Sequence, residues 1–172
     1  MHSPSPRLNR TRWRSVSRSE LSERAELEQA AVRLLAIREH SRAELRRKLQ
    51  SRCEAPALLE QVLDGLEQQD YLSDARFVEQ YVSSRKLKGF GPVRIRQELL
   101  ERGVASTLAD PSTDPGDSEW LTLISQCCRR KFGDSLPADF RERAKRARFL
   151  EYRGFPCELI RSFLWSDPAG EL

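Results

Sequence analysis

Residues 85–103 read RKLKGFGPVRIRQELLERG, and the interpretation of this stretch decides the fold. Its second half indicates a helix that opens at Pro92 and closes at Gly103, because proline suits the first helical position and glycine suits a left-handed helix end. Its first half, KGFG, allows two interpretations, which are a β-strand or a break between two helices. The choice separates a sheet-based fold from an all-α fold.

The strand interpretation comes from the RNA-binding signature of an RRM sheet, which begins with the same pattern. That signature requires alternating aromatic and β-branched residues to follow, so that ring faces stack on bases. Here Gly91 is followed by Pro92, which cannot donate a hydrogen bond into a central strand. We reject the strand interpretation. Gly89 and Gly91 interrupt one helix, Pro92 begins the next, and the fold class is predicted to be all-α.

Helix signals continue on both sides of this stretch. Apolar residues recur at helical spacing, and the sequence from Ser41 to Glu44 is a capping box, in which Ser41 accepts from a free N–H and Glu44 reaches back. Ser73 is a second N-cap, and Trp120 begins another apolar stripe. Further helices are predicted to open at prolines, which are Pro56, Pro92, Pro137 and Pro156.

One helix-end pattern recurs along the chain. Arg52, Arg102 and Arg153 lie 50 and 51 residues apart, and each follows a leucine by three positions. Gly103 and Gly154 come directly after two of them, whereas Cys53 fills the first slot. This spacing predicts three tandem repeats of three helices each, which stack into an elongated, curved array.

The predicted organisation has five segments. Residues 1–20 are basic and contain few apolar anchors, so they are expected to be a disordered tail. The other segments are repeat 1 (21–70), repeat 2 (71–116), repeat 3 (117–166) and a short C-terminal tail (167–172).

Composition narrows the function classes. Hydrophobic residues make up 38% of the chain and charged residues 33%, which favours an extended molecule with a thin core. The net charge of +4 does not by itself imply nucleic acid. The four cysteines form no C-x-x-C pair and there are only two histidines, so no metal or other cofactor is expected. The cysteines are interpreted as buried small apolar residues in a reducing cytoplasm.

Basic bands follow the repeat period. Residues 33–52 hold seven basic and two acidic side chains, residues 85–96 hold five and none, and residues 129–148 hold eight and three. If the repeats stack in register, these bands form a discontinuous basic surface that can contact a partner or phosphate. The alternative is that each band is only a solvated helix face. The candidate contact residues, chosen by charge alone, are Arg42, Arg46, Lys48, Arg85, Lys86, Lys88, Arg94, Arg96, Arg129, Arg130, Lys131, Arg143, Lys145 and Arg146.

Residues 71–104, YLSDARFVEQYVSSRKLKGFGPVRIRQELLERGV, resemble the most recognisable segment of RecX regulatory proteins. SRAELRRKLQSR (41–52) and FLEYRGFPCELI (149–160) are similar to the matching segments of the flanking repeats. The resemblance implies a protein of the bacterial cytoplasm with no catalytic residues. It also implies a partner, the RecA recombinase and its filament on single-stranded DNA, and weak direct DNA binding, since some members bind DNA. We expect the protein to be a monomer that does not bind membranes. RecX proteins inhibit strand exchange, ATP hydrolysis and coprotease activity, and so modulate DNA repair, recombination and the SOS response.

One stretch departs from the family pattern. The third helix of repeat 2 should be long, but Pro111, Pro115 and Gly116 forbid a continuous helix there. We expect a short helix or a loop, and a looser joint between repeats 2 and 3.

The sequence also bears on two other function classes. An enzyme is disfavoured because the chain has no Walker A loop, no H-E-x-x-H and no G-x-S-x-G, and the Ser83–Lys86 match to S-x-x-K is too short to be specific. His40 is interpreted as a loop histidine, and Asp74 as a first-turn acid. A general basic helical-repeat DNA-binding protein is the alternative, and steep salt dependence would mark it.

Overall fold

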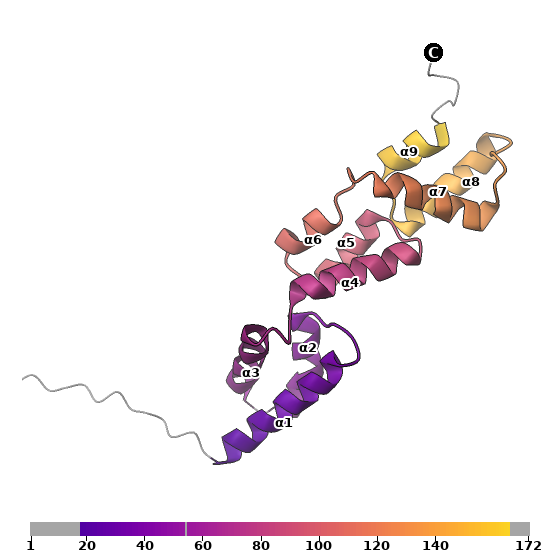
Figure 1. Cartoon of the computed structure of the whole chain (residues 1–172). Coiled ribbons are helices and arrows are strands. Elements are labelled where there is room, and N and C mark those ends of the chain that lie inside the picture. Colours follow the sequence, from indigo (N-terminus) through magenta and orange to yellow (C-terminus); the bar gives the residue numbers. More distant parts are fainter. Residues whose placement is uncertain (1–17, 54, 166–172) are drawn as a thin grey trace, which may run out of the picture.

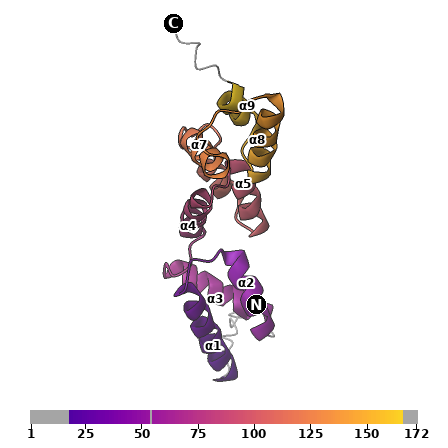
Figure 2. The same cartoon turned by 90° about the vertical axis from the view of Figure 1, so that its right-hand side faces the viewer.

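The computed structural model describes residues 18–53 and 55–165, and every regular element in this part of the chain is a helix. The helices form an elongated, curved array (Figure 1), and a view turned by 90° shows the same end-to-end order (Figure 2). The predicted all-α fold is therefore confirmed. The helices are α1 (Arg18–Leu35), α2 (Arg42–Leu49), the 3₁₀ helix η1 (Gln50–Arg52), α3 (Pro56–Gln68), α4 (Asp74–Leu87), α5 (Pro92–Glu101), α6 (Ser106–Ser112), α7 (Glu119–Phe132), α8 (Phe140–Arg153) and α9 (Cys157–Trp165).

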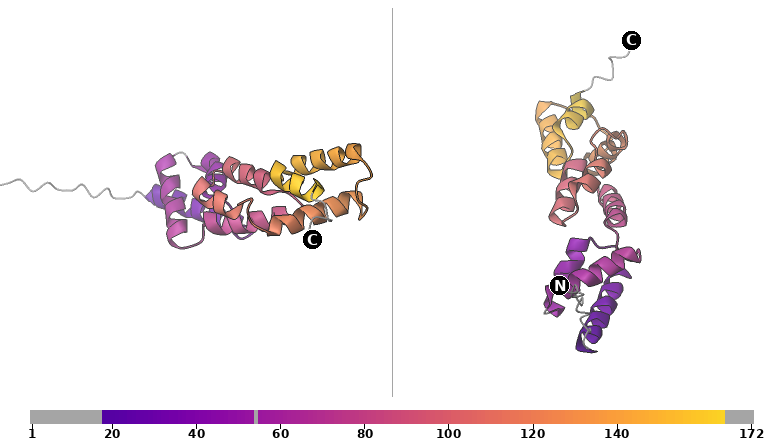
Figure 3. Two further views of the ribbon diagram at one scale, coloured as in Figure 1. Left: turned by 90° about the horizontal axis from the view of Figure 1, so that it is seen from above. Right: turned by 90° about the vertical axis from the view of Figure 1, so that its left-hand side faces the viewer.

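Three helices make up each repeat. Helices α1–α3 form the first repeat, α4–α6 the second and α7–α9 the third, and the first and third lie at opposite ends of the array in the further views (Figure 3). Helix α1 begins at Arg18, so the last three residues of the segment predicted as a tail are helical. An acid in the first turn, Glu20, suits the positive end of that helix. Residues 1–17 and the predicted C-terminal tail lie outside the described residues.

Most predicted helix starts are confirmed. Pro92 lies in the first turn of α5, Pro56 in the first turn of α3, and the Ser73 side chain caps α4 by accepting from Arg76 N. The start at Pro137 is wrong, because α8 begins three residues later at Phe140. There Asp139 accepts from Glu142 N at 2.7 Å, and the Glu142 carboxylate accepts from Ala138 N at 2.8 Å. This reciprocal cap fixes the start of α8 after the proline.

The first capping box is only half formed. Ser41 accepts from Glu44 N at 3.1 Å, as predicted. The Glu44 carboxylate does not reach back but pairs with Arg38 at 3.0 Å and with Arg102 of the second repeat at 3.3 Å. Glu44 was predicted to cap the start of its own helix, but it contributes instead to the joint between the first two repeats.

The described residues form two hydrophobic cores. The core of the first repeat includes Leu27, Leu45 and Leu63. The other is shared by the second and third repeats, and in it Phe77 of α4 joins the same cluster as Trp120 of α7. The prediction of a looser joint between repeats 2 and 3 is therefore wrong.

The reason lies in the short third helix of repeat 2. Helix α6 has seven residues with Pro111 inside it, and Ala109 and Thr113 are buried at its end. The link that follows folds back, because Trp120 Nε1 donates to Asp114 O at 2.8 Å. Trp120 is 1% exposed, so a short α6 brings α7 onto the second repeat rather than loosening it.

Polar contacts join the first repeat to the second. Arg76 pairs with Glu39 at 2.9 Å, Arg102 pairs with Glu44, and Arg42 N donates to Asp74 at 2.7 Å. Both ion pairs are only partly buried, so solvent and salt screen them, and each contributes modestly compared with a shared apolar core. The joint between repeats 1 and 2 is therefore the weaker of the two.

Both joints form where two middle helices meet. The residue before one middle helix donates a hydrogen bond to the carbonyl oxygen of the arginine at the end of the next repeat's middle helix. Ser41 Oγ donates to Arg102 O at 2.7 Å, and Gly91 N donates to Arg153 O at 2.8 Å. The repeated arginine identified from the sequence is thus the point at which one repeat meets the next.

The glycines after these arginines allow that close approach. Gly103 and Gly154 have φ values of +77° and +89°, the left-handed region that favours glycine. A Cβ on Gly103 would collide with Ala43, and one on Gly154 with Arg94. Cys53, in the equivalent slot of the first repeat, has an extended φ of −131°. Among the described residues, no other repeat packs against this end of the first repeat, so the position of Cys53 does not require glycine.

Ser41 has a double role that a single substitution can test. Its hydroxyl is buried, caps α2 and donates across the joint, so Ser41→Ala should cost about 2 kcal/mol of the free energy of unfolding of the first repeat. Ser73→Ala removes a cap alone and should cost about 1 kcal/mol. Hydrogen exchange of the α2 amides in the Ser41 variant and of the α4 amides in the Ser73 variant would measure the two costs. Equal costs would contradict the role of Ser41 in the joint.

Candidate protein and phosphate interface

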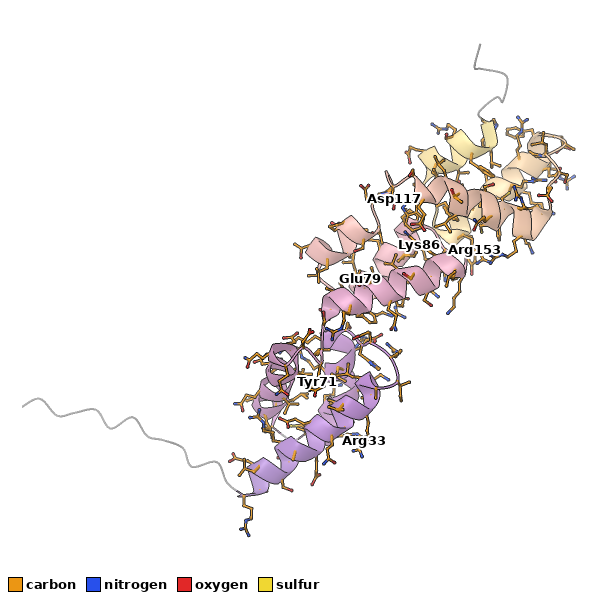
Figure 4. All side chains as sticks on the ribbon, viewed as in Figure 1. Arg33, Tyr71, Glu79, Lys86, Asp117 and Arg153 are labelled. Carbon is orange, nitrogen blue, oxygen red and sulfur yellow. The ribbon has the colours of Figure 1, made fainter. Side chains whose placement is uncertain are left out.

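An arginine–aromatic cluster lies where the second and third repeats meet. The Phe90 ring follows α4, and three guanidinium groups lie over it, those of Arg85 at 4.2 Å, Arg94 at 4.5 Å and Arg153 at 5.2 Å from the ring centroid. Such cation–π contacts hold long side chains in fixed places. Figure 4 labels Arg153 at this joint, and its Nη1 donates to Lys88 O at 3.0 Å.

One carboxylate organises the cluster. Glu98 of α5 accepts from Arg85, from Arg94 at 3.1 Å and from Tyr81 Oη at 2.8 Å. Burial opposes ionisation of Glu98, but these hydrogen bonds outweigh it, so the pKa of Glu98 lies below its usual value. Burial and the bond to Glu98 raise the pKa of Tyr81 to about 12. Glu98 therefore stays ionised and holds Arg85, Arg94 and Tyr81 in place by hydrogen bonds.

Several members of this cluster face solvent. Lys88 and Tyr152 are exposed, the latter at 74%, and the neighbouring Leu87 is 78% exposed. Arg94 lies 5.5 Å from the centroid of the Tyr152 ring. Cationic and aromatic side chains displayed together suit phosphate groups and acidic protein surfaces. We call this set the joint surface, and its members are Arg85, Lys88, Phe90, Arg94, Glu98, Tyr152 and Arg153.

The basic residues of the first repeat are bound internally. Arg42 pairs with Glu60 at 2.8 Å and with Asp64 at 2.6 Å, and Arg46 pairs with Glu60 at 2.6 Å. The hydrogen bonds from Arg46 and Arg42 lower the pKa of Glu60 to about 2. Of the three candidates in this band, Lys48 alone is exposed without an ion pair among the described residues.

The shifted pKa of Glu60 gives a pH-dependent contribution to stability. The folded-state pKa lies below the usual 4.5, so the stabilisation is present above pH 4.5 and lost as the pH falls towards 2. The Glu60 side chain is 40% exposed, so solvent screening reduces the effect to about 1 kcal/mol. Glu60→Gln should cost that much at neutral pH and nothing near pH 2, as followed by urea titration with circular dichroism.

Glu79→Gln is the matched control for this pH experiment. Glu79 is exposed on α4, where Figure 4 labels it, and it forms no ion pair within the described residues. Its replacement should leave the free energy of unfolding unchanged at both pH values. An equal loss in the two variants at neutral pH would contradict the account of Glu60.

The other sequence-predicted residues lie in different settings. Lys86 pairs with Glu119 at 2.6 Å and lies over Trp120, and Arg96 pairs with Asp110 at 2.8 Å. Arg146 is only 4% exposed. The third repeat contains the remaining candidates, at the end of α7 and along α8. They are Arg129, Arg130, Lys131, Arg143, Lys145 and Arg146.

The structure brings together three of the fourteen candidates in the joint surface, namely Arg85, Lys88 and Arg94. A selection by charge missed Phe90 and Tyr152, which are aromatic, and Glu98, which is acidic. It also omitted Arg153, although the 50-residue spacing had marked that residue as a repeat end. The signal that could have identified Arg153 is that it ends the middle helix of its repeat and follows the basic band of residues 129–148.

Within the described residues, no helix is long and apolar enough to span a membrane. The same part of the chain holds no cluster of three or more histidine, cysteine or acidic side chains arranged to bind a metal ion. Two cysteines, Cys127 and Cys128, are buried as predicted, but Cys53 is only partly buried and Cys157 is exposed, so that interpretation is wrong for Cys157. His40 lies in a loop, as predicted, and is buried.

These observations define a tandem-repeat protein of three-helix units, with a cationic–aromatic surface at one joint. Models of the first, second and third three-helix domains of RecX match residues 29–66, 73–110 and 117–164. The chain belongs to the RecX family.

Relatives and solved structures agree with this assignment. The regulatory protein RecX of Pseudomonas fluorescens is 45% identical over 134 residues, which covers 78% of this chain and 86% of the relative. The regulatory protein RecX of Halorhodospira halophila is 43% identical over 133 residues, covering 77% and 83%. A crystal structure of RecX from Lactobacillus salivarius superposes with a TM-score of 0.69 at 20% identity, covering 84% of this chain and 96% of that one. A second crystal structure, of a regulatory protein RecX, gives a TM-score of 0.71 at 18% identity, covering 84% and 73%.

Proposed function

We propose that this protein is a regulator that binds the RecA recombinase and its filament on single-stranded DNA. It inhibits the recombinase, ATPase and coprotease activities, and so modulates DNA repair, recombination and the SOS response. The proposal is supported by membership of a family whose named relatives are regulatory proteins, and by the partner that the RecX resemblance implies. The protein acts as a monomer in the bacterial cytoplasm, without catalytic residues or a cofactor.

The joint surface is the observation that carries this proposal furthest. It lies at the joint between the second and third repeats, where an elongated array can follow the helical groove of a nucleoprotein filament and bridge adjacent protomers. Its four cations are Arg85, Lys88, Arg94 and Arg153, and its one acid, Glu98, pairs with Arg85 and Arg94. The surface therefore keeps a net positive charge, which is complementary to acidic protein surfaces and to phosphate. Contacts of this kind supply orientation and association rate more than affinity.

The test is ATP hydrolysis by RecA on single-stranded DNA. Protein added at a small fraction of the RecA concentration should lower the hydrolysis rate, because one bound molecule affects several protomers. An unchanged rate at every ratio of this protein to RecA would contradict the proposed function.

The same titration separates a filament regulator from a general DNA-binding repeat protein. A filament regulator should inhibit RecA at concentrations where it retains little single-stranded DNA in a gel shift at physiological salt. A general DNA-binding protein should retain the DNA alone, with an affinity that falls steeply as salt rises. DNA retention at or below the inhibitory concentration would favour the DNA-binding alternative.

A further inference from the structure

A cavity of about 430 Å³ lies in the third repeat, away from the residues of the joint surface. It is bounded by the end of α7, the loop after it, α8 and the end of α9. We call it the end pocket. Its cationic lining consists of Arg129, Arg143 and Arg146, and its apolar lining includes Leu136, Phe163 and Trp165. Its volume is within the range of pockets that hold small ligands or single side chains with their flanking backbone.

Two arginines in this pocket have donors that no group of the described residues accepts. Arg146 donates from Nη1 to Ser135 O at 2.9 Å and from Nη2 to Glu142 at 2.8 Å, but its buried Nε has no acceptor in that part of the chain. The Nε of Arg143 is also buried without an acceptor, and Arg143 forms no ion pair with the described residues. A buried donor left unsatisfied costs about 1–3 kcal/mol, and charged groups cost more. Two such donors in one pocket are therefore available to an acceptor on a ligand.

The charges around the pocket select the kind of acceptor. Arg129 pairs with Asp134 at 2.8 Å and Arg146 with Glu142, so among the described residues that line the pocket Arg143 is the cation without an ion pair. A single guanidinium of this kind matches one carboxylate. The two nearby acids, Asp134 and Glu142, would oppose a run of closely spaced phosphates.

The apolar lining indicates what lies beside that carboxylate. Leu136 is 83% exposed and Trp165 is 41% exposed, and both border the pocket together with Phe163. Sites for single-stranded nucleic acid combine an open cationic groove with a series of aromatic faces. Here Arg143 is the cation without an ion pair among the described residues, and the cavity walls are aliphatic as well as aromatic. This combination suits a peptide.

We propose that the end pocket binds an acidic peptide segment of a partner protein. One carboxylate of the segment pairs with Arg143, and a neighbouring large apolar side chain packs against Leu136, Phe163 and Trp165. The inference does not depend on the proposed function, because peptide binding can be measured without the recombinase.

The experiment uses the full chain and a panel of short fluorescein-labelled peptides. The peptides combine glutamate or aspartate with leucine or phenylalanine, and a second panel replaces the acids with lysine. Fluorescence anisotropy should show saturable binding of acidic–apolar peptides and none of the lysine versions. Arg143→Glu should weaken that binding by about tenfold or more, because it puts a like charge against the carboxylate. Leu136→Ala should weaken it less.

Arg141→Glu is the matched control, since Arg141 is exposed on the same helix, does not line the pocket, and changes the net charge equally. It should leave peptide affinity nearly unchanged. Circular dichroism establishes that the variants fold, and Arg143→Gln replaces Arg143→Glu if the latter does not.

Three results would overturn the proposal. The first is no saturable binding of any acidic–apolar peptide. The second is an equal loss in the Arg141 and Arg143 variants, which would indicate a general charge effect. The third is that the protein binds a labelled single-stranded oligonucleotide but no peptide, and that Arg143→Glu removes this binding. That result would make the pocket a nucleic-acid contact.

Discussion

Replacing Gly91 with alanine should cost about 3 kcal/mol of the free energy of unfolding of the second and third repeats. A Cβ at Gly91 would meet the Gly154 carbonyl group and lie 2.5 Å from Phe155 N. These are backbone atoms, which cannot rotate away as a side chain can. The two repeats would have to separate, which strains the hydrogen bond from Gly91 N to Arg153 O and the core around Trp120.

Hydrogen exchange followed by mass spectrometry measures this effect repeat by repeat. Exchange should accelerate in peptides from α4 to α9 and stay unchanged in α1 to α3, because the first repeat has its own core. Gly65→Ala is the matched control. Gly65 lies inside α3 with only the flexible Arg24 side chain within 4 Å, so alanine there should stabilise the first repeat by about 0.5–1 kcal/mol. Unchanged exchange in the Gly91 variant would contradict the tight joint.

The double variant Lys88→Glu with Tyr152→Ala should need about tenfold more protein to inhibit ATP hydrolysis by RecA. Both side chains are exposed, so their replacement should leave the core and the helix content intact. The change reverses one charge of the joint surface and removes the ring beside Arg94. The measurement is the hydrolysis rate on single-stranded DNA against the concentration of the variant.

Arg161→Glu is the control for net charge in that assay. Arg161 is exposed on α9, and it lies outside the three basic bands. Its replacement changes the net charge by the same amount and should leave inhibition nearly unchanged. An equal loss in both variants would show that overall charge, rather than the joint surface, sets the inhibition. No loss in either would remove the joint surface from the interface.

The helical fold could be predicted because its signals are local. Pro92 after Gly91 excludes a strand, and the Ser73 cap acts within one turn of its helix. The recurrence of Arg102-Gly103 and Arg153-Gly154 also reported something physical, namely the close contact between consecutive repeats. The strength of each joint was not predictable in this way, because it depends on which distant apolar residues meet. Trp120 reaches the core of the second repeat only because the link before it folds back onto Asp114.

The candidate interface was only partly accessible from the sequence. The charge band of residues 85–96 contains Arg85, Lys88 and Arg94, which are close in the chain. The charge bands could not show that Arg42 is bound by the acids of α3, because the ion pairs join residues 18 to 25 positions apart. Nor could they show that Arg153 lies over the same ring as Arg85, which is 68 residues earlier in the chain. The contribution of a charge to a surface depends on these long-range partners.

The most direct test of the proposed interface is electron microscopy of a RecA filament on single-stranded DNA with this protein bound. We expect the array to lie along the filament groove with Lys88, Phe90 and Tyr152 facing RecA or the DNA. A bound array whose joint surface faces solvent, with the filament contacted through another face, would contradict this account.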